Sequence, residues 1–194
     1  MLGLKRHTVR LVRHNEKWHA IFLKTKGQLI KVIGKYIIDI QHVGSTAIKG
    51  IYAKPILDIA IAIKNKSNID KFKHKLEKIG YEYRGDGRRD GGVLFVKFSV
   101  PELRTQHLHF IETNDIQWKN YINFRDYLNK NKKTALQYSK LKRNLRKKFA
   151  NDRKAYTKAK NKFIDKVLYN IRGGKRIKLT DRNTIVYGRD QQKV

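Results

Sequence analysis

The segment 42–46 has the composition of a phosphate-binding turn. It reads His-Val-Gly-Ser-Thr and ends a run of β-branched residues that predicts a strand. Gly44 lets backbone N–H groups approach an anion closely, because it has no side chain to block the approach. Ser45 adds a hydroxyl donor, and a helix beginning at Ser45 would also direct its dipole toward a phosphate. A Gly-Ser pair is common in ordinary turns too, so the pair alone does not establish a binding site.

Asp58 is the charged residue within the apolar run 56–63. A carboxylate in such a strand is costly to bury unless it meets a cation, a metal ion or hydrogen-bond donors. Because side chains alternate along a strand, Asp58 shares its face with Ala60 and Ala62, which are small enough to leave room for a ligand. The alternative is a structural ion pair with a base such as Lys54.

His107 and His109 are two residues apart on a predicted strand, so both imidazoles lie on one face. Two neighbouring imidazoles can bind phosphate, bind a metal ion or transfer protons near neutral pH. Arg104, just upstream, is a candidate phosphate clamp. Glu112 is a candidate second carboxylate, although alternation places it opposite the histidines. Exposed histidines on an edge strand are the competing interpretation.

The apolar pattern predicts the elements that hold these groups. Asn15 and Ser67 are expected to cap helices that end near residues 33 and 79. After residue 115 the spacing is helical, and the second stripe there contains Tyr138, Leu141, Leu145 and Phe149. Strands are expected at 9–12, 36–43, 56–63, 81–83, 93–98 and 107–112, the last two paired.

The predicted organisation is one unit over residues 1–171, with an α/β core at 1–115 and a helical part at 116–171. The basic tail, residues 172–194, forms a hairpin between 177–179 and 185–187 or is disordered.

Composition narrows the classes of function. The chain has no cysteine, which excludes disulfides, thiolate metal sites and a cysteine nucleophile. Its formal charge of +30 divides into +11 for residues 1–115 and +19 for residues 116–194. Such a surface attracts nucleotides, RNA or another polyanion, unless the lysines only solvate helix faces. No apolar stretch reaches the ~18 residues of a membrane span, and residues 1–13 do not resemble a signal peptide, so we expect a cytoplasmic protein.

Seven short motifs follow one another in order along the chain. They read NEKW at 15–18, HVGSTA at 42–47, KPILDI at 54–59, RTQHLH at 104–109, FRDYL at 124–128, YSKLK at 138–142 and YTKAK at 156–160. In these motifs the chain resembles the GrpB-like family, which is grouped with the nucleotidyltransferase superfamily. The resemblance covers residues 8–171 and implies an α/β (α+β) fold: a nucleotidyltransferase-like mixed sheet flanked by helices, with a helical C-terminal half.

The resemblance also implies a reaction by analogy: transfer of a nucleotidyl group from a nucleoside triphosphate to an acceptor, with Mg²⁺ or Mn²⁺ held by paired carboxylates. Ala60 stands where the second carboxylate belongs, so the set is incomplete. The expected roles are catalysis by Asp58, His107 and His109, metal binding by Asp58 and Glu112, and phosphate binding by His42, Gly44, Ser45, Thr46, Lys54 and Arg104.

Two other classes of function compete with an enzyme. Ala60 favours a nucleotide- or cofactor-binding module without turnover. The basic C-terminal half favours a nucleic-acid-associated protein, but Tyr121, Tyr138 and Tyr156 fall on stripes typical of packing rather than base stacking.

Overall fold

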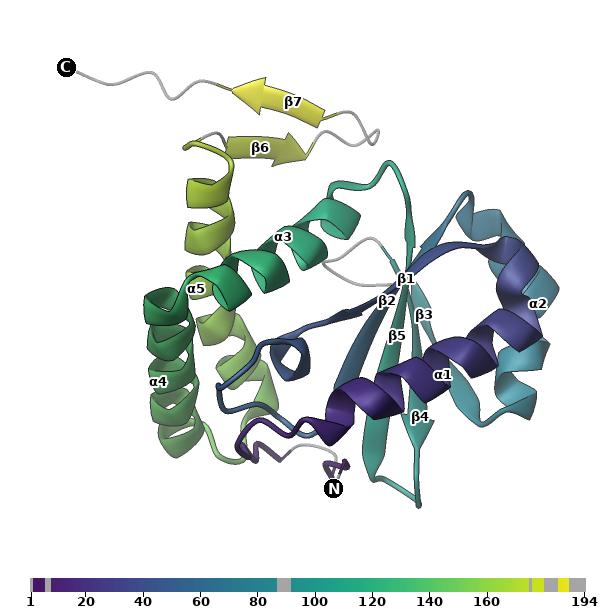
Figure 1. Ribbon diagram of the computed structural model, residues 1–194, viewed down its shortest axis with the longest axis horizontal. Helices are drawn as coiled ribbons and strands as arrows, with labels where there is room; N and C mark the ends of the chain where they lie inside the picture. Colours follow the sequence, from purple (N-terminus) through teal and green to yellow (C-terminus); the bar gives the residue numbers. More distant parts are fainter. Residues whose placement is uncertain (1, 6–7, 87–91, 175, 180–184, 189–194) are drawn as a thin grey trace.

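A five-stranded mixed sheet forms the centre of the protein (Figure 1). The computed structural model describes residues 2–5, 8–86, 92–174, 176–179 and 185–188. Strand β2 runs parallel to β5, and the other neighbouring strands are antiparallel. In the spatial order β1-β2-β5-β4-β3, the strands are β1 (Ile37–Val43), β2 (Leu57–Ile63), β5 (Arg104–Glu112), β4 (Val93–Phe98) and β3 (Tyr81–Asp86).

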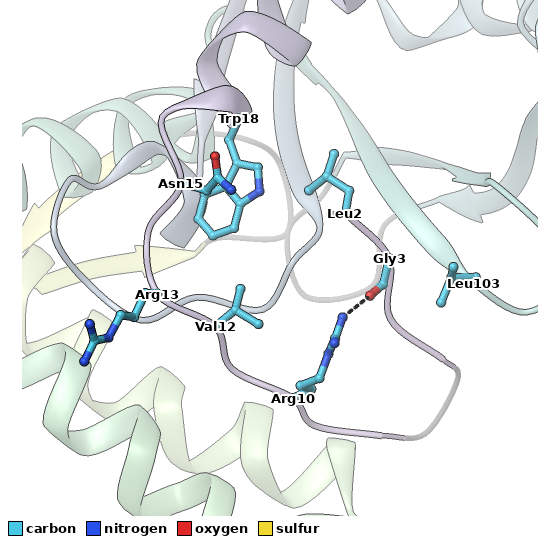
Figure 2. Close-up of a pocket in the computed structure, with 8 residues that line it drawn as sticks. All are labelled: Leu2, Gly3, Arg10, Val12, Arg13, Asn15, Trp18 and Leu103. Carbon is cyan, nitrogen blue, oxygen red and sulfur yellow. Dashed lines mark hydrogen bonds between the residues drawn. The ribbon is translucent and has the colours of Figure 1, made fainter.

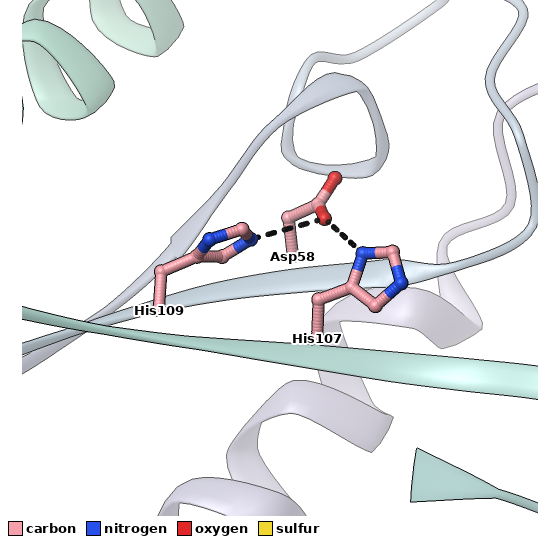
Figure 3. A group of neighbouring side chains, drawn as sticks. All are labelled: Asp58, His107 and His109. Atoms are coloured by element: carbon pink, nitrogen blue, oxygen red, sulfur yellow. Dashed lines mark hydrogen bonds and ion pairs between the residues drawn. The ribbon is translucent and has the colours of Figure 1, made fainter. Parts of the chain in front are cut away.

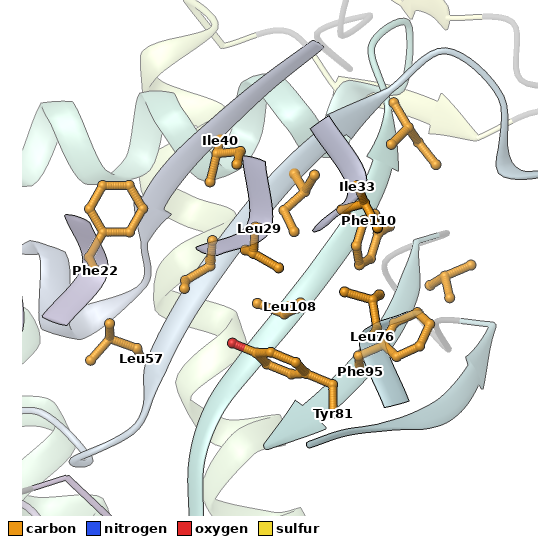
Figure 4. Close-up of a cluster of buried hydrophobic side chains, with 14 of the residues drawn as sticks. Phe22, Leu29, Ile33, Ile40, Leu57, Leu76, Tyr81, Phe95, Leu108 and Phe110 are labelled. Carbon is orange, nitrogen blue, oxygen red and sulfur yellow. The ribbon is translucent and has the colours of Figure 1, made fainter. Parts of the chain in front are cut away.

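One face of the sheet is covered by α1 (Lys17–Ile33) and α2 (Ile69–Lys78). The helices bury residues at helical spacing, Phe22, Leu29 and Ile33 from α1 among them, against side chains on alternate positions of β2 and β5. These side chains form the main core (Figure 4). Because the apolar residues of each strand must face this core, it determines on which side of the sheet the remaining strand residues lie. Residues of β2 that point away from α1 and α2 therefore lie on the opposite face, together with Asp58.

Helix α3 packs on that opposite face, and α4 and α5 pack beside it (Figure 1). Trp118 and Tyr121 of α3 pack against Val43, Ala60 and Ile111 of the sheet. A second cluster joins all three helices to the loop between β1 and β2. The helices are α3 (Ile116–Lys130), α4 (Lys132–Lys148) and α5 (Arg153–Ile171), and three short 3₁₀ turns are η1 (Gly34–Tyr36), η2 (Ser45–Ala47) and η3 (Lys66–Asn68).

The mixed α+β architecture predicted from the sequence is confirmed, while several local predictions are wrong. The strand expected at 9–12 is a single bridge between Val12 and Ala53, with no ladder to extend it. No helix begins at Ser45, because η2 is one 3₁₀ turn. The Asn65 side chain, rather than that of Ser67, accepts the capping hydrogen bond. Asn15 accepts from the Lys17 N–H as expected.

The buried face of α4 differs from the predicted stripe. Leu141, Leu145 and Phe149 are only partly buried. A lysine thus occupies the core-facing stripe, which consists of Ala135, Tyr138, Ser139 and Lys142.

In the tail, β6 (Arg176–Leu179) pairs antiparallel with β7 (Ile185–Gly188), with Ile177 opposite Tyr187. The turn predicted between these strands, and residues 189–194, lie outside the described residues. Among the helices that the structure describes, none is long and apolar enough to span a membrane.

Candidate functional site

Asp58, His107 and His109 come together on the face of the sheet that α3 covers. The parallel register of β2 and β5 sets Asp58 beside His107 and Ala60 beside His109. Oδ1 of Asp58 lies 3.0 Å from Nδ1 of His107 and 3.4 Å from Nε2 of His109. Both rings point a nitrogen at the same carboxylate oxygen (Figure 3). One ligand atom from each of the three residues lies within 4.8 Å of the other two.

The hydrogen bonds of this group fix its proton arrangement. An ionised carboxylate only accepts, so His107 donates through Nδ1 and His109 through Nε2. Desolvation alone would raise the pKa of Asp58, but these two hydrogen bonds outweigh it and hold the pKa well below its ordinary value. The Tyr121 hydroxyl lies 3.4 Å from Nδ1 of His109. Burial lowers the pKa of His107, partly offset by Asp58, so this imidazole is neutral near pH 7.

Gly44 brings the turn after β1 against the Asp58 carboxylate. Its backbone is in the left-handed region at φ 70°, and a Cβ atom there would stand 2.5 Å from Oδ2 of Asp58. A side chain at this position would therefore collide with the carboxylate. The next residue, Ser45, directs its hydroxyl to the Tyr138 hydroxyl of α4 at 3.5 Å. The Gly-Ser turn thus lies between Asp58 and the helical part.

Two lysines extend the site toward α4 and α5. Lys142 is only 1% exposed, donates to the Tyr52 carbonyl and lies 4.3 Å from the centre of the Tyr138 ring. Lys54 lies 4.4 Å from the centre of the Tyr156 ring. Within the part of the chain that the structure describes, neither lysine forms an ion pair. Lys142 is therefore buried and Lys54 partly buried, and neither has a carboxylate in contact.

The electrostatic surroundings of these lysines are cationic. Burial lowers the pKa of Lys54, Lys160 and Arg153 lower it further and Asp58 opposes them, and the resulting pKa is about 7. Burial also holds the pKa of Lys142 well below its usual value, reinforced by Lys160 and Lys54. The Tyr156 hydroxyl is buried and has no hydrogen-bond partner among the described residues. Such a concentration of positive charge and unused donors suits an anionic ligand.

The helical part holds the loop that carries Ser45 and Lys54. Asn129 of α3 accepts from the Lys49 N–H and donates to the Ala47 carbonyl. Ser139 of α4 accepts from the Tyr52 N–H. These bonds explain how the loop keeps a fixed position although most of it lacks regular structure.

Two residues predicted to bind phosphate lie elsewhere. In β1, Val43 is opposite Asp58 and His42 is opposite Ile59, so His42 points to the α1 face. The His42 ring stacks on Phe22, and its Nε2 lies 2.9 Å from the Thr46 hydroxyl. Both side chains are buried and engaged with each other, so we no longer assign His42 or Thr46 to phosphate binding.

Arg104 and Glu112 are at opposite ends of β5. The Arg104 guanidinium lies over the Phe98 ring, 5.9 Å from its centre. The Glu112 carboxylate accepts from the Lys66 N–H at 2.8 Å and thereby holds η3. The alternation that sets Glu112 opposite the histidines accounts for its absence from the group.

A separate pocket lies between the N-terminal segment and α1 (Figure 2). Its volume is about 250 Å³, and Arg10 donates to the Gly3 carbonyl at its wall. None of its lining residues belongs to the Asp58 group or to the lysine pair. The lining residues are Leu2, Gly3, Arg10, Val12, Arg13, Asn15, Trp18 and Leu103.

Solved structures define the class of fold. A crystal structure of the Cid1 poly(U) polymerase with Mg and 3′-dATP bound superimposes with a TM-score of 0.51 at 14% identity, over 92% of this chain and 61% of that one. At this identity the likeness concerns the fold alone. The protein therefore has a nucleotidyltransferase-like α+β fold, as the sequence predicted.

The family follows from closer relatives. A model of the GrpB protein family matches residues 8–170. The glutamate-rich protein GrpB of Alkalihalophilus pseudofirmus is 41% identical over 87% of this chain and 98% of its own length. The crystal structure of the conserved protein GrpB from Enterococcus faecalis superimposes with a TM-score of 0.71 at 25% identity, over 82% of this chain and 99% of that one. Protein YqkA of Bacillus subtilis is 30% identical, over 92% of this chain and 51% of its own length. The chain belongs to the GrpB family.

Proposed function

We propose that this chain binds the phosphate groups of a nucleoside triphosphate, or of a related phosphate ligand, between the Gly44-Ser45 turn and the lysines 54 and 142. The observation that carries the proposal is the burial of Lys54 and Lys142 without an ion pair. Burying an uncompensated ammonium group is costly, and a phosphate in contact with both would remove that cost. Lysine is a common phosphate ligand in proteins because it presents a compact charge with three donors.

Two further observations support a phosphate ligand. The Ser45 hydroxyl donates to the hydroxyl of Tyr138, whose ring lies against Lys142. Lys54 lies over the ring of Tyr156, whose buried hydroxyl has no hydrogen-bond partner among the described residues. The fold likeness to a polymerase with bound 3′-dATP makes a nucleotide the first class of ligand to test.

The reaction that we propose for the site is transfer of a nucleotidyl group. An acceptor oxygen would bond to the α-phosphorus of the triphosphate while the bond to pyrophosphate breaks, and the acceptor proton would pass to solvent water. The acceptor remains to be identified. Polyphosphate binding by Ser45, Lys54 and Lys142 would hold the leaving group and compensate its charge.

Magnesium, which the fold class implies, does not fit the residues present. Mg²⁺ prefers oxygen ligands in octahedral geometry. Here Ala60 takes the place of the second carboxylate, and the other two donors near Asp58 are the imidazoles of His107 and His109. We therefore derive no step through Mg²⁺, and Glu112 cannot complete the set because its carboxylate is bonded to the Lys66 N–H.

Ligand binding without turnover is the second function that a specific observation favours. Ala60 removes the carboxylate pair on which nucleotidyl transfer in this fold class is expected to depend. Saturable nucleotide binding with no product after long incubation would support it, and detection of a transferred nucleotide would refute it.

A thermal-shift screen tests the proposal. Nucleoside triphosphates and coenzyme A would be added with Mg²⁺ or Mn²⁺ to the wild type and to Asp58→Asn. A ligand present at about 100 times its Kd should stabilise the fold by about 2.7 kcal/mol. Stabilisation by a triphosphate supports the proposal. If none of the triphosphates shifts the unfolding temperature at millimolar concentration, the proposal is contradicted.

RNA or another polyanion is the alternative partner, through the +19 charge of residues 116–194. The tyrosines on the helices do not favour base stacking, because Tyr138 and Tyr156 are each 1% exposed. Binding of the RNA phosphate backbone to this basic surface would weaken steeply with added salt, whereas binding of a phosphate ligand in a buried site would weaken less. A cytoplasmic location, where triphosphates and RNA are available, stays part of this proposal.

A further inference from the structure

We propose that Asp58, His107 and His109 bind a late first-row dication such as Zn²⁺ or Co²⁺ in preference to Mg²⁺. The proposal concerns the Asp58 carboxylate, which adjoins the Gly44-Ser45 turn of the proposed function. It is tested with the metal ion alone, so it can fail while phosphate binding stands, and the reverse also holds.

The donor atoms have the separations of a metal site. Zinc lies about 2.0–2.2 Å from imidazole nitrogen and carboxylate oxygen, so two ligands of a tetrahedral ion are about 3.3 Å apart. Oδ1 of Asp58 lies 3.0 Å from the His107 nitrogen and 3.4 Å from the His109 nitrogen. A change of tautomer, which moves each proton to the other ring nitrogen, would free both lone pairs for one metal ion with little movement of the side chains.

The ring nitrogens suit metal binding better than proton transfer to a substrate. In His109, Nε2 is hydrogen-bonded to Asp58 and Nδ1 lies beside the Tyr121 hydroxyl, so both ring nitrogens are engaged. In His107, Nδ1 is hydrogen-bonded to Asp58, and Nε2 is buried without a partner among the described residues. Neither histidine presents a free nitrogen to solvent as a general base would. Tyr121 is placed where it can orient the His109 ring, as groups behind metal-bound imidazoles commonly do.

The type of donor decides the preferred ion. Imidazole nitrogen suits zinc, cobalt, nickel, copper and iron, whereas magnesium and calcium are held by oxygen. Two imidazoles and one carboxylate also leave part of the coordination sphere for a further ligand. The three side chains remain accessible for this, with exposures of 32% for Asp58, 12% for His107 and 18% for His109.

The test uses untagged, chelator-treated protein titrated with Co²⁺, whose visible absorption reports low-coordinate binding. We expect one equivalent of Co²⁺ to bind, Zn²⁺ to displace it, and millimolar Mg²⁺ to leave it in place. His109→Ala should weaken Co²⁺ binding at least tenfold. The matched control is His74→Ala, which removes an exposed histidine of α2 and should leave the titration unchanged. His109→Asp should shift the preference toward Mg²⁺ and Mn²⁺, because it replaces a nitrogen ligand by an oxygen ligand.

Circular dichroism and metal-free thermal unfolding establish that each variant is folded. Should His109→Ala not fold, X-ray absorption at the cobalt edge of the wild type still counts its imidazole ligands, and two are expected. The proposal is overturned by equal Co²⁺ binding in the wild type and a folded His109→Ala variant, by displacement of Co²⁺ by Mg²⁺ at equal concentration, or by no Co²⁺ binding at all. The last result would leave the three residues as a hydrogen-bonded network only.

Discussion

Gly44 and Asp58 are packed so closely that a Cβ atom on Gly44 would stand 2.5 Å from Oδ2 of the carboxylate. The turn after β1 and the acidic residue of β2 therefore form one unit, although 13 residues separate them in the sequence. The turn that carries Ser45 is held against Asp58. This contact links the proposed phosphate site to the proposed metal site.

Gly44→Ala should disrupt that contact, and Gly50→Ala is its matched control. The two glycines have φ values of 70° and 72°, so the backbone is strained by an alanine at both positions. A Cβ at Gly50 meets nothing within 4 Å. We expect chemical denaturation to show that Gly44→Ala lowers the free energy of unfolding by at least about 1 kcal/mol more than Gly50→Ala. Equal losses would show that the turn does not depend on its contact with Asp58.

Lys142→Met should separate ligand binding from stability. It removes a buried charge but keeps the length of the side chain, so without ligand we expect a change of less than about 1 kcal/mol in the free energy of unfolding. Triphosphate affinity should fall at least tenfold, because a charged ligand of the phosphate is lost. Calorimetric titration and thermal unfolding measure the two quantities. Lys140→Met, an exposed lysine of the same helix, should change neither; a similar loss of affinity there would point to a diffuse surface effect.

Lys54 should make stability depend on pH. Its folded-state pKa is about 7, below the ordinary value of 10.5, so between these values the unfolded chain binds more protons than the folded one. Stability therefore rises with pH across this window and is lower below pH 7. Subtracting the stability curve of Lys54→Met from that of the wild type should isolate this rise between pH 7 and about 10. A difference that is flat with pH would contradict the burial of this ammonium group.

The same group should make phosphate binding depend on pH in the opposite direction. A phosphate attracts the protonated amine, so affinity should fall as pH rises above 7 in the wild type. The decline should be weaker in Lys54→Met. Titration at pH 6, 7.5 and 9 with one triphosphate measures this, and an affinity that rises with pH would exclude Lys54 from the site.

His42 should contribute to acid sensitivity and not to ligand binding. Burial lowers the His42 pKa to about 4, so the unfolded chain binds more protons between about 4 and 6.5. Stability from this residue is complete above pH 6.5 and is lost as pH falls toward 4, by at most about 3 kcal/mol. His42→Gln should flatten the stability curve in acid and leave triphosphate affinity unchanged at pH 7.5. A tenfold loss of affinity would return His42 to the phosphate site.

The sequence predicted the fold well because the main core follows simple periodicities. Alternation in β2 and helical spacing in α1 are strong patterns, and both depend on apolar residues that must be buried. The same alternation predicted that His107 and His109 share a face. Their contact with Asp58 could not be predicted in this way, because it depends on the parallel pairing of β2 with β5. That pairing is a long-range relationship that local sequence patterns do not contain.

The residues that sequence reasoning missed have a common physical cause. Lys142 stands on the buried face of α4, but a lysine is ordinarily assigned to the solvent face. Its ammonium group lies over the Tyr138 ring and donates to the Tyr52 carbonyl, and these two contacts hold it inside the protein. His42 was wrongly assigned to the site because it adjoins the Gly44-Ser45 turn in sequence, whereas its side chain lies on the face of the sheet that α1 covers. A one-residue step along β1 decides that difference.

The measurement that tests the account most directly is calorimetric titration of a nucleoside triphosphate into the wild type and into the double variant Lys54→Met/Lys142→Met at 0.15 M salt. We expect saturable binding at one site by the wild type. In the double variant we expect the affinity to fall at least a hundredfold, with the circular dichroism spectrum unchanged. Equal affinity in the two proteins, or no saturable binding by the wild type at millimolar ligand, would contradict the assignment of a phosphate site between the Gly44-Ser45 turn and the lysine pair.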